Sequence, residues 1–128
     1  MKRTIVLAML SLAAGCSAGL EGVWKGSGEA GEGHFYQFTL DTTNPEKPFA
    51  LMSCPGKAEI RVPVCGLKEV EKRVEFRLDP TDANATCETA RNLRTYAGEY
   101  GQDVITGTVV DAAGKSAGMF RAFRQVKD

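Results

Sequence analysis

The sequence lacks the patterns that carry metal or cofactor chemistry. It has a single histidine, His34, which we interpret as a rim or turn residue. No cysteines or histidines stand at the spacing of a zinc site, so we expect no metal. The glycines of Gly26-Ser27-Gly28 precede a strand-like segment rather than a helix, which argues against a nucleotide-binding loop. With no nucleophile and base in a recognisable arrangement, we expect neither an enzyme nor a cofactor.

The sequence also lacks charge of one sign and long apolar runs. Its 16 basic and 16 acidic residues balance, so the chain has no net positive charge that would attract nucleic acid as a partner. No apolar run approaches the roughly 20 residues that a transmembrane helix needs. Glycine is abundant, with 14 residues, and Val, Ile, Thr, Phe and Tyr occur in short runs. This composition favours one all-β domain.

The N-terminal segment resembles a bacterial lipoprotein signal peptide. Lys2 and Arg3 precede a short apolar stretch, and Leu12-Ala13-Ala14-Gly15-Cys16 resembles a lipobox. The resemblance implies cleavage after Gly15 and lipid on Cys16, with residues 16–19 as a short tether. Ordinary secretion, with cleavage after Ala18, is the alternative.

A lipid anchor would place the protein in the bacterial cell envelope, because two or more acyl chains hold a protein stably on a membrane. Ser17 after the cysteine favours the outer membrane. Removal of residues 1–15 takes away two basic residues and no acidic one, which leaves a net charge of about −2. We therefore expect the anchor, and not a basic surface, to be the contact with the membrane.

The sequence pattern predicts that the domain at residues 20–128 is a series of short strands joined by tight turns. Such a meander closes naturally into an antiparallel up-and-down barrel, and a β-sandwich is the alternative. Pro63 predicts an edge, a bulge or a strand end. We interpret residues 68–73 as a charged turn and 86–93 as a short helix. The eight expected strands are 20–28, 34–40, 49–54, 58–64, 72–78, 95–100, 103–110 and 116–124.

The triplet Gly22-Val23-Trp24 at the start of the first strand is similar to the Gly-x-Trp signature of the calycins, the group that includes the lipocalins. The resemblance implies that a basic residue near the end of the last strand packs across the indole. Arg121 and Arg124 are the candidates. In a closed meander the first and last strands are neighbours, so either guanidinium could make a cation–π contact with Trp24.

Three cysteines remain besides Cys16. The bacterial envelope is oxidising, so we expect one disulfide. In the meander, Cys54 and Cys87 fall at the same rim and Cys65 at the opposite one. This predicts a Cys54–Cys87 bridge with Cys65 buried and free, while the other two pairings stay open.

The strand pattern leaves two main hypotheses for function. An eight-stranded barrel can hold one small ligand or be filled by its own side chains. The first hypothesis is a lipid-anchored, monomeric protein that binds a small apolar ligand or lipid. The second is an interaction protein whose loops 41–47 and 79–86 block an envelope or host hydrolase, and a structural envelope component is a third. The side chains that could line a cavity, or simply form the core, are Tyr36, Phe38, Leu40, Phe76 and Phe120.

Overall fold

The computed structural model describes residues 19–29 and 34–126, and this part of the chain is all-β. The lipobox with Cys16 lies outside the described residues. Residues 86–93 form turns and not the predicted helix, and no described helix is long and apolar enough to cross a membrane. The nine strands are β1 (Val23–Glu29), β2 (Phe35–Asp41), β3 (Phe49–Ser53), β4 (Ile60–Pro63), β5 (Cys65–Val70), β6 (Arg73–Leu78), β7 (Arg94–Tyr100), β8 (Val104–Val110) and β9 (Ser116–Arg124).

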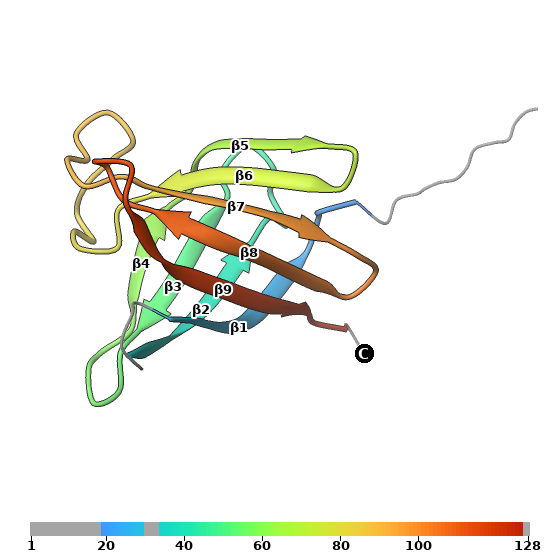
Figure 1. Cartoon of the computed structure of the whole chain (residues 1–128), viewed down its shortest axis with the longest axis horizontal. Coiled ribbons are helices and arrows are strands. Elements are labelled where there is room, and N and C mark those ends of the chain that lie inside the picture. The colour runs from blue at the N-terminus through green and yellow to red at the C-terminus, as the bar shows by residue number, and fades with distance from the viewer. Residues whose placement is uncertain (1–18, 30–33, 127–128) are drawn as a thin grey trace, which may run out of the picture.

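The strands form one sheet in the order β4-β3-β2-β1-β9-β8-β7-β6-β5. Every neighbouring pair is antiparallel, including β1 with β9, so the first and last strands lie side by side (Figure 1). The sheet curls into a nearly closed barrel whose open seam lies between β4 and β5. The prediction of an all-β antiparallel meander is confirmed, but the number of strands is nine rather than eight.

The extra strand arises because the chain changes partner at Val64. Because every neighbouring pair in the sheet is antiparallel, β4 and β5 run in the same direction, and only Val64 separates them along the chain. The first segment pairs with β3 and the second with β6. A bulge between Cys65 and Lys68, with Gly66 at φ 61°, bends the chain at this point. The predicted charged turn at 68–73 is therefore wrong: only Glu71 and Lys72 form the turn between β5 and β6.

Pro63 protects the exposed edge of β4. The N–H of Val64 donates to the carbonyl of Pro48 at 3.0 Å, so the adjacent position 63 would direct its N–H away from β3. Proline has no N–H to expose there. Pro63 ends β4 and also leaves no free donor at that position for another strand.

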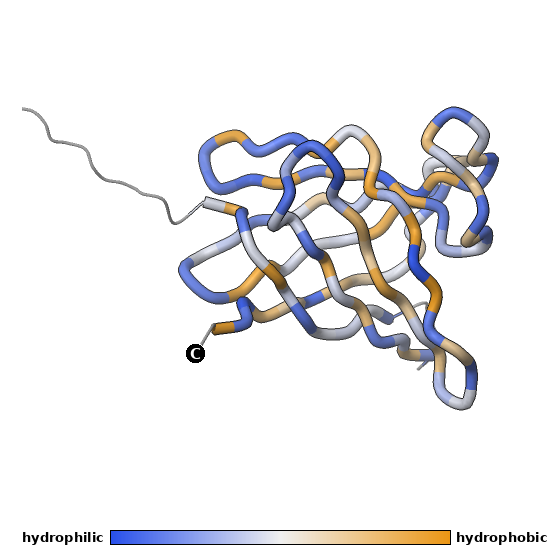
Figure 2. The backbone as a smooth tube through the Cα atoms, turned by 180° about the vertical axis from the view of Figure 1, so that it is seen from behind, coloured by the Kyte–Doolittle hydropathy of each residue, from blue (hydrophilic) through white to orange (hydrophobic). Residues whose placement is uncertain are grey.

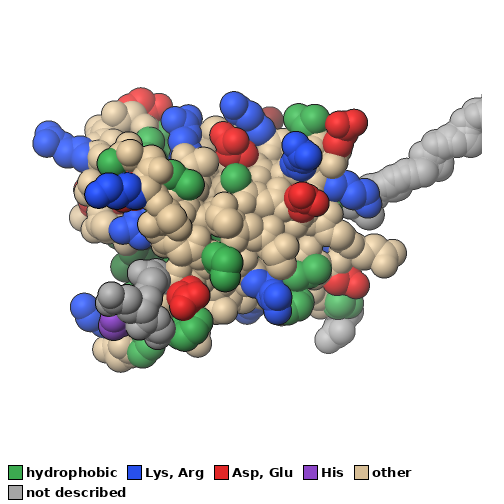
Figure 3. Space-filling model, viewed as in Figure 1, with side chains coloured by type: hydrophobic (Ala, Val, Ile, Leu, Met, Phe, Trp, Pro, Cys, Tyr) green, Lys and Arg blue, Asp and Glu red, His purple; other side chains and the backbone are tan. Residues whose placement is uncertain are grey.

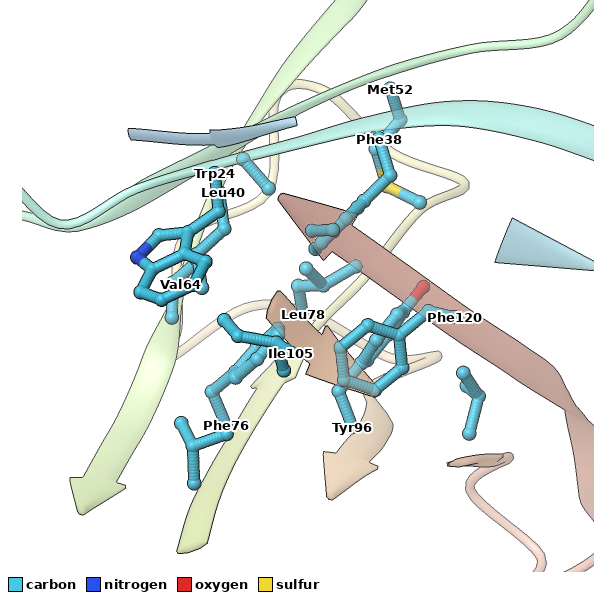
Figure 4. Close-up of a cluster of buried hydrophobic side chains, with 14 of the residues drawn as sticks. Trp24, Phe38, Leu40, Met52, Val64, Phe76, Leu78, Tyr96, Ile105 and Phe120 are labelled. Carbon is cyan, nitrogen blue, oxygen red and sulfur yellow. The ribbon is translucent and has the colours of Figure 1, made fainter. Parts of the chain in front are cut away.

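Buried and more exposed residues alternate along strands such as β2 and β6. Figure 2 shows the hydropathy of each residue along the backbone, with hydrophobic and hydrophilic positions interspersed along the strands. Four rings fill the middle of the barrel (Figure 4). Phe38, Phe76 and Tyr96 stack nearly parallel, with centroids 5.1 to 6.3 Å apart, and Phe120 meets them edge-on. All four are at most 3% exposed, so the barrel has a packed centre and not a deep cavity.

Arg124 closes the end of the barrel at which β1 begins. Its guanidinium carbon lies 4.2 Å from the centroid of the fully buried Trp24 ring. Its nitrogens donate to the carbonyls of Gly19, Glu21 and Gln102 at 2.8 to 3.0 Å. Arg121, the other candidate, lies on the outer face of β9 opposite Ser27 and does not cover the indole. We call this end of the barrel, where β1 begins, β9 ends and Trp24 is buried, the closed end.

The predicted Cys54–Cys87 disulfide is wrong, because Cys65 pairs with Cys87. The prediction treated the fourth strand as straight, which would carry Cys65 away from the loop that holds Cys87. The change of partner at Val64 instead sets Cys65 opposite Arg77, one residue before β6 ends. The loop that follows β6 therefore returns directly to Cys65. Cys54 has no partner among the described cysteines and is exposed.

Candidate functional site

The end opposite Trp24, which we call the open end, carries the loops 54–59, 79–93 and 111–115 (Figure 1). Between the first two loops lies a hollow of about 450 Å³, which we call the open-end hollow. This volume is within the range of small-molecule sites. Its lining consists of Tyr36, Met52, Ser53, Cys54, Lys57, Ala58, Ile60, Pro80, Thr81, Arg94 and Tyr96.

Two tyrosines form the floor of the open-end hollow, above the stacked rings. Both phenols are at least nine-tenths buried, and their oxygens lie 3.3 Å apart. Gly28 makes room for one of them, because the Tyr36 ring passes over the position that a side chain at residue 28 would occupy. Burial raises the pKa of Tyr36 and, more strongly, the pKa of Tyr96, so both hydroxyls stay protonated at neutral pH.

The walls of the hollow are apolar and its charged groups are cationic. Met52 and Ile60 are paired on the neighbouring strands β3 and β4, so their side chains lie side by side, and Pro80 comes from the loop after β6. Arg94, at the start of β7, and Lys57, in the 54–59 turn, are the only charged residues of the lining. Figure 3 shows Lys and Arg side chains projecting at this end of the molecule.

The loop 79–93, which forms part of the rim of the hollow, is held in place by hydrogen bonds and by a disulfide. Asp79, which is 5% exposed, accepts hydrogen bonds from the amide and hydroxyl of Thr81 and from the amide of Asn92. Burial alone would raise the pKa of Asp79, but these bonds outweigh it and hold the pKa below its usual range. The Cys65–Cys87 disulfide ties the middle of the same loop to β5. The wall that carries Pro80 and Thr81 is therefore held in place before any ligand binds.

Of the five side chains predicted to line a cavity, only Tyr36 reaches the open-end hollow. Phe38, Leu40, Phe76 and Phe120 pack in the core, and Phe120 also borders a smaller hollow near Phe35 and Met119. Sequence analysis missed the residues Met52, Ile60, Arg94 and Tyr96. The alternation of β3 and β7 could have found Met52 and Tyr96, since both stand at inward positions. Nothing in the sequence says that the ends of these strands border a hollow.

A second hollow, of about 630 Å³, lies outside the barrel beside β3 and β4. It is bordered by residues of the loops after β2 and after β6, the two loops for which we predicted protein contacts. These loops leave the barrel at opposite ends. Arg61 stacks on Phe49 at its base, 3.7 Å from the ring centroid. Its lining consists of Glu46, Lys47, Pro48, Phe49, Arg61, Pro63, Val64, Ala83 and Cys87.

Within residues 19–29 and 34–126, no group of three or more His, Cys, Asp or Glu side chains is arranged to hold a metal ion. His34, the one histidine, is exposed just before β2. No protein family, no curated protein and no solved structure matches this chain.

Proposed function

We propose that the protein is a lipid-anchored component of the bacterial envelope that binds a small ligand in the open-end hollow of a calycin-like barrel. The lipobox-like segment supports the anchor, and the Arg124–Trp24 contact at the closed end supports the resemblance to calycins. The observation that carries the binding function is the open-end hollow itself: a concave, mostly apolar space with a polar floor, bordered by a loop that is held in place.

The hollow also sets the size of the ligand. Because stacked rings fill the centre of the barrel, the ligand enters only as far as Tyr36 and Tyr96. A long-chain lipid would have to leave much of its chain outside a space of about 450 Å³. We therefore favour a compact molecule of one or two rings over a long acyl chain.

Native mass spectrometry of the full chain, purified from a bacterial host, tests this function. We expect a retained adduct of small-molecule mass. Ala58→Trp places an indole at the mouth of the hollow and should abolish the adduct. Gln102→Trp, which places the same side chain at an exposed position of the closed end, far from the hollow, should keep it. Equal adducts on both variants would place the ligand elsewhere and reject the proposal.

A second candidate function is an interaction protein that blocks a hydrolase through its loops. Two observations favour it: the centre of the barrel is filled, and the loops 42–48 and 79–93 both border the outer hollow beside β3 and β4. Lys47→Glu and Ala83→Trp alter that hollow without touching the open-end hollow. Loss of a cross-linked protein partner in these variants, with the small-molecule adduct unchanged, would support the second function.

A further inference from the structure

The floor of the open-end hollow has an unused hydrogen-bond donor. The hydroxyls of Tyr36 and Tyr96 share one contact of 3.3 Å, which is long for a bond between two hydroxyls. Each phenol carries one proton, and one shared bond uses only one of the two. No other described residue hydrogen-bonds either oxygen, so the remaining O–H is left for an acceptor within the hollow. Both phenols are neutral donors at physiological pH, because burial raises the pKa of each.

Arg94 adds a cation to the lining of the hollow. Arg94 is half-buried, and its guanidinium makes no hydrogen bond to another described residue. Its charge lies close enough to both phenols to act on the pKa of each. A guanidinium in such a place offers a planar set of donors that matches a carboxylate, sulfonate or phosphate.

The nearby carboxylates lie outside the lining of the open-end hollow. Asp111 borders a neighbouring hollow with Arg94 and accepts hydrogen bonds from the amides of Lys115 and Ala113, both at 2.9 Å. These bonds hold the pKa of Asp111 below its usual range, and the charge of Arg94 helps to lower it. Asp79 accepts its bonds from Thr81 and Asn92. No Asp or Glu is among the residues that line the open-end hollow, whereas Lys57 is. The charged residues that line the open-end hollow itself are therefore all cationic, and Asp111 offsets Arg94 only from the neighbouring hollow.

We propose that the ligand of the open-end hollow is a compact amphipathic anion. Its acidic group binds Arg94 and a phenol O–H of the Tyr36–Tyr96 pair, and its apolar body lies against Met52, Ile60 and Pro80. Lys57 at the mouth adds a second positive charge. This inference rests on the proposed binding function and specifies the chemical class of the ligand.

Two fluorescent probes that differ mainly in charge test the inference on the full-length protein. Anilinonaphthalene sulfonate carries an anionic group on an anilinonaphthalene body, and N-phenylnaphthylamine has the same rings without the anion. We expect the sulfonate to bind at least roughly tenfold more tightly, since hydrogen bonds to a charged group contribute that much. Ala58→Trp should block both probes, which shows that they occupy this hollow, and Gln102→Trp at the closed end should block neither.

Arg94→Gln should lower the affinity for the sulfonate roughly tenfold or more and leave the affinity for the neutral probe unchanged. Arg121→Gln, on the outer face of β9, is the matched control and should change neither. Tyr36→Phe keeps the ring and removes one hydroxyl, and should weaken only the sulfonate. Inorganic phosphate should not displace the sulfonate at equal concentration, because it lacks the apolar body.

The possible outcomes separate the two proposals. Tight binding of the neutral probe, with weaker binding of the sulfonate, would overturn the anionic ligand and keep the binding function. Sulfonate binding that Arg94→Gln does not change would also overturn the role of Arg94. Binding of neither probe, with no adduct in native mass spectrometry, would reject the binding function itself.

Discussion

At the scale of single residues, Arg124 is the side chain that joins the most distant parts of the chain. Its guanidinium covers Trp24 and donates to three backbone carbonyls, two of them more than 100 positions away in the sequence. Lysine could keep the charge but not the set of donors that reaches all three carbonyls. The closed end of the barrel is therefore stabilised through one side chain.

Arg124→Leu should lower the free energy of unfolding by roughly 2–3 kcal/mol, because it removes the cation–π contact and the hydrogen bonds to the carbonyls. Arg121→Leu, three residues earlier on the exposed face of the same strand, should change it by less than about 0.5 kcal/mol. Urea denaturation followed by the fluorescence of Trp24 measures both. Equal losses in the two variants would show that Arg124 does not stabilise the closed end.

Asp79 makes stability depend on acid pH. Its pKa is held below the unfolded value of about 3.9, so its contribution is present above that value and is lost as pH falls through the lower folded pKa. Asp79→Asn should cost roughly 1–2 kcal/mol at pH 7, and the difference from wild type should shrink at about pH 3. Denaturation at both pH values tests this, with Glu88→Gln, an exposed residue of the same loop, as control. A difference that does not change with pH would contradict the prediction.

Single-residue features divide into those that sequence predicts and those that it does not. The contact between Trp24 and the last strand follows from a short motif and the closure of a meander. The role proposed for Arg94 does not, because a basic residue at the start of a strand is common, and only the structure shows that it lies beside two buried phenols. The phenols beside Arg94 come together only where β2 and β7 meet in the interior, and these two strands are far apart in the sequence.

At the scale of elements, the sharpest departure from the sequence prediction is the segment from Ile60 to Val70. The alternation of residues 58–64 correctly indicates a strand, but it gives no sign that the strand changes neighbours at Val64. The exposed charges of Lys68 and Glu69 conceal the second part, since an edge strand with one partner has little to bury. The error in the disulfide follows from this one bend, because it decides which rim Cys65 approaches.

The turn after β5 is also strained in a way that can be relieved. Glu71 and Lys72 are the two central residues of the hairpin and have φ angles of 51° and 68°. Positive φ at both positions is the pattern of a type I′ turn, for which Asn-Gly is the preferred pair. Replacement of Glu71-Lys72 by Asn-Gly should raise the free energy of unfolding by roughly 0.5–1 kcal/mol.

The control for this turn is Asn-Gly at Ala112-Ala113, a turn in which Gly114 already takes the positive φ of 87°. That replacement should give no gain. Thermal unfolding and urea denaturation report both changes. A loss of stability on replacing Glu71-Lys72 would mean that their side chains make contacts that outweigh the backbone strain.

At the scale of the whole molecule, the proposed anchor and the proposed binding site belong to opposite ends of the barrel. Gly19 is bound to Arg124 at the closed end, and the proposed lipid on Cys16 is three residues earlier, within about 11 Å along an extended chain. The open-end hollow lies across the barrel, beyond strands of about seven residues, or roughly 20 Å. An anchored protein would therefore hold its closed end near the bilayer and its hollow away from it, accessible to a soluble ligand.

Cysteine labelling on intact membranes tests this orientation. Cys54 lies at the open end and is exposed, so a bulky membrane-impermeant maleimide should label it as fast on the membrane as after release in detergent. In a Cys54→Ser background, Gln102→Cys introduces a thiol at an exposed position of the closed end, and the bilayer should slow its labelling several-fold. Cys16→Ser should release the protein from the membrane fraction and remove the difference between the two sites. Faster labelling at residue 102 than at Cys54 on the membrane would reverse the proposed orientation, and continued membrane attachment of Cys16→Ser would reject the anchor.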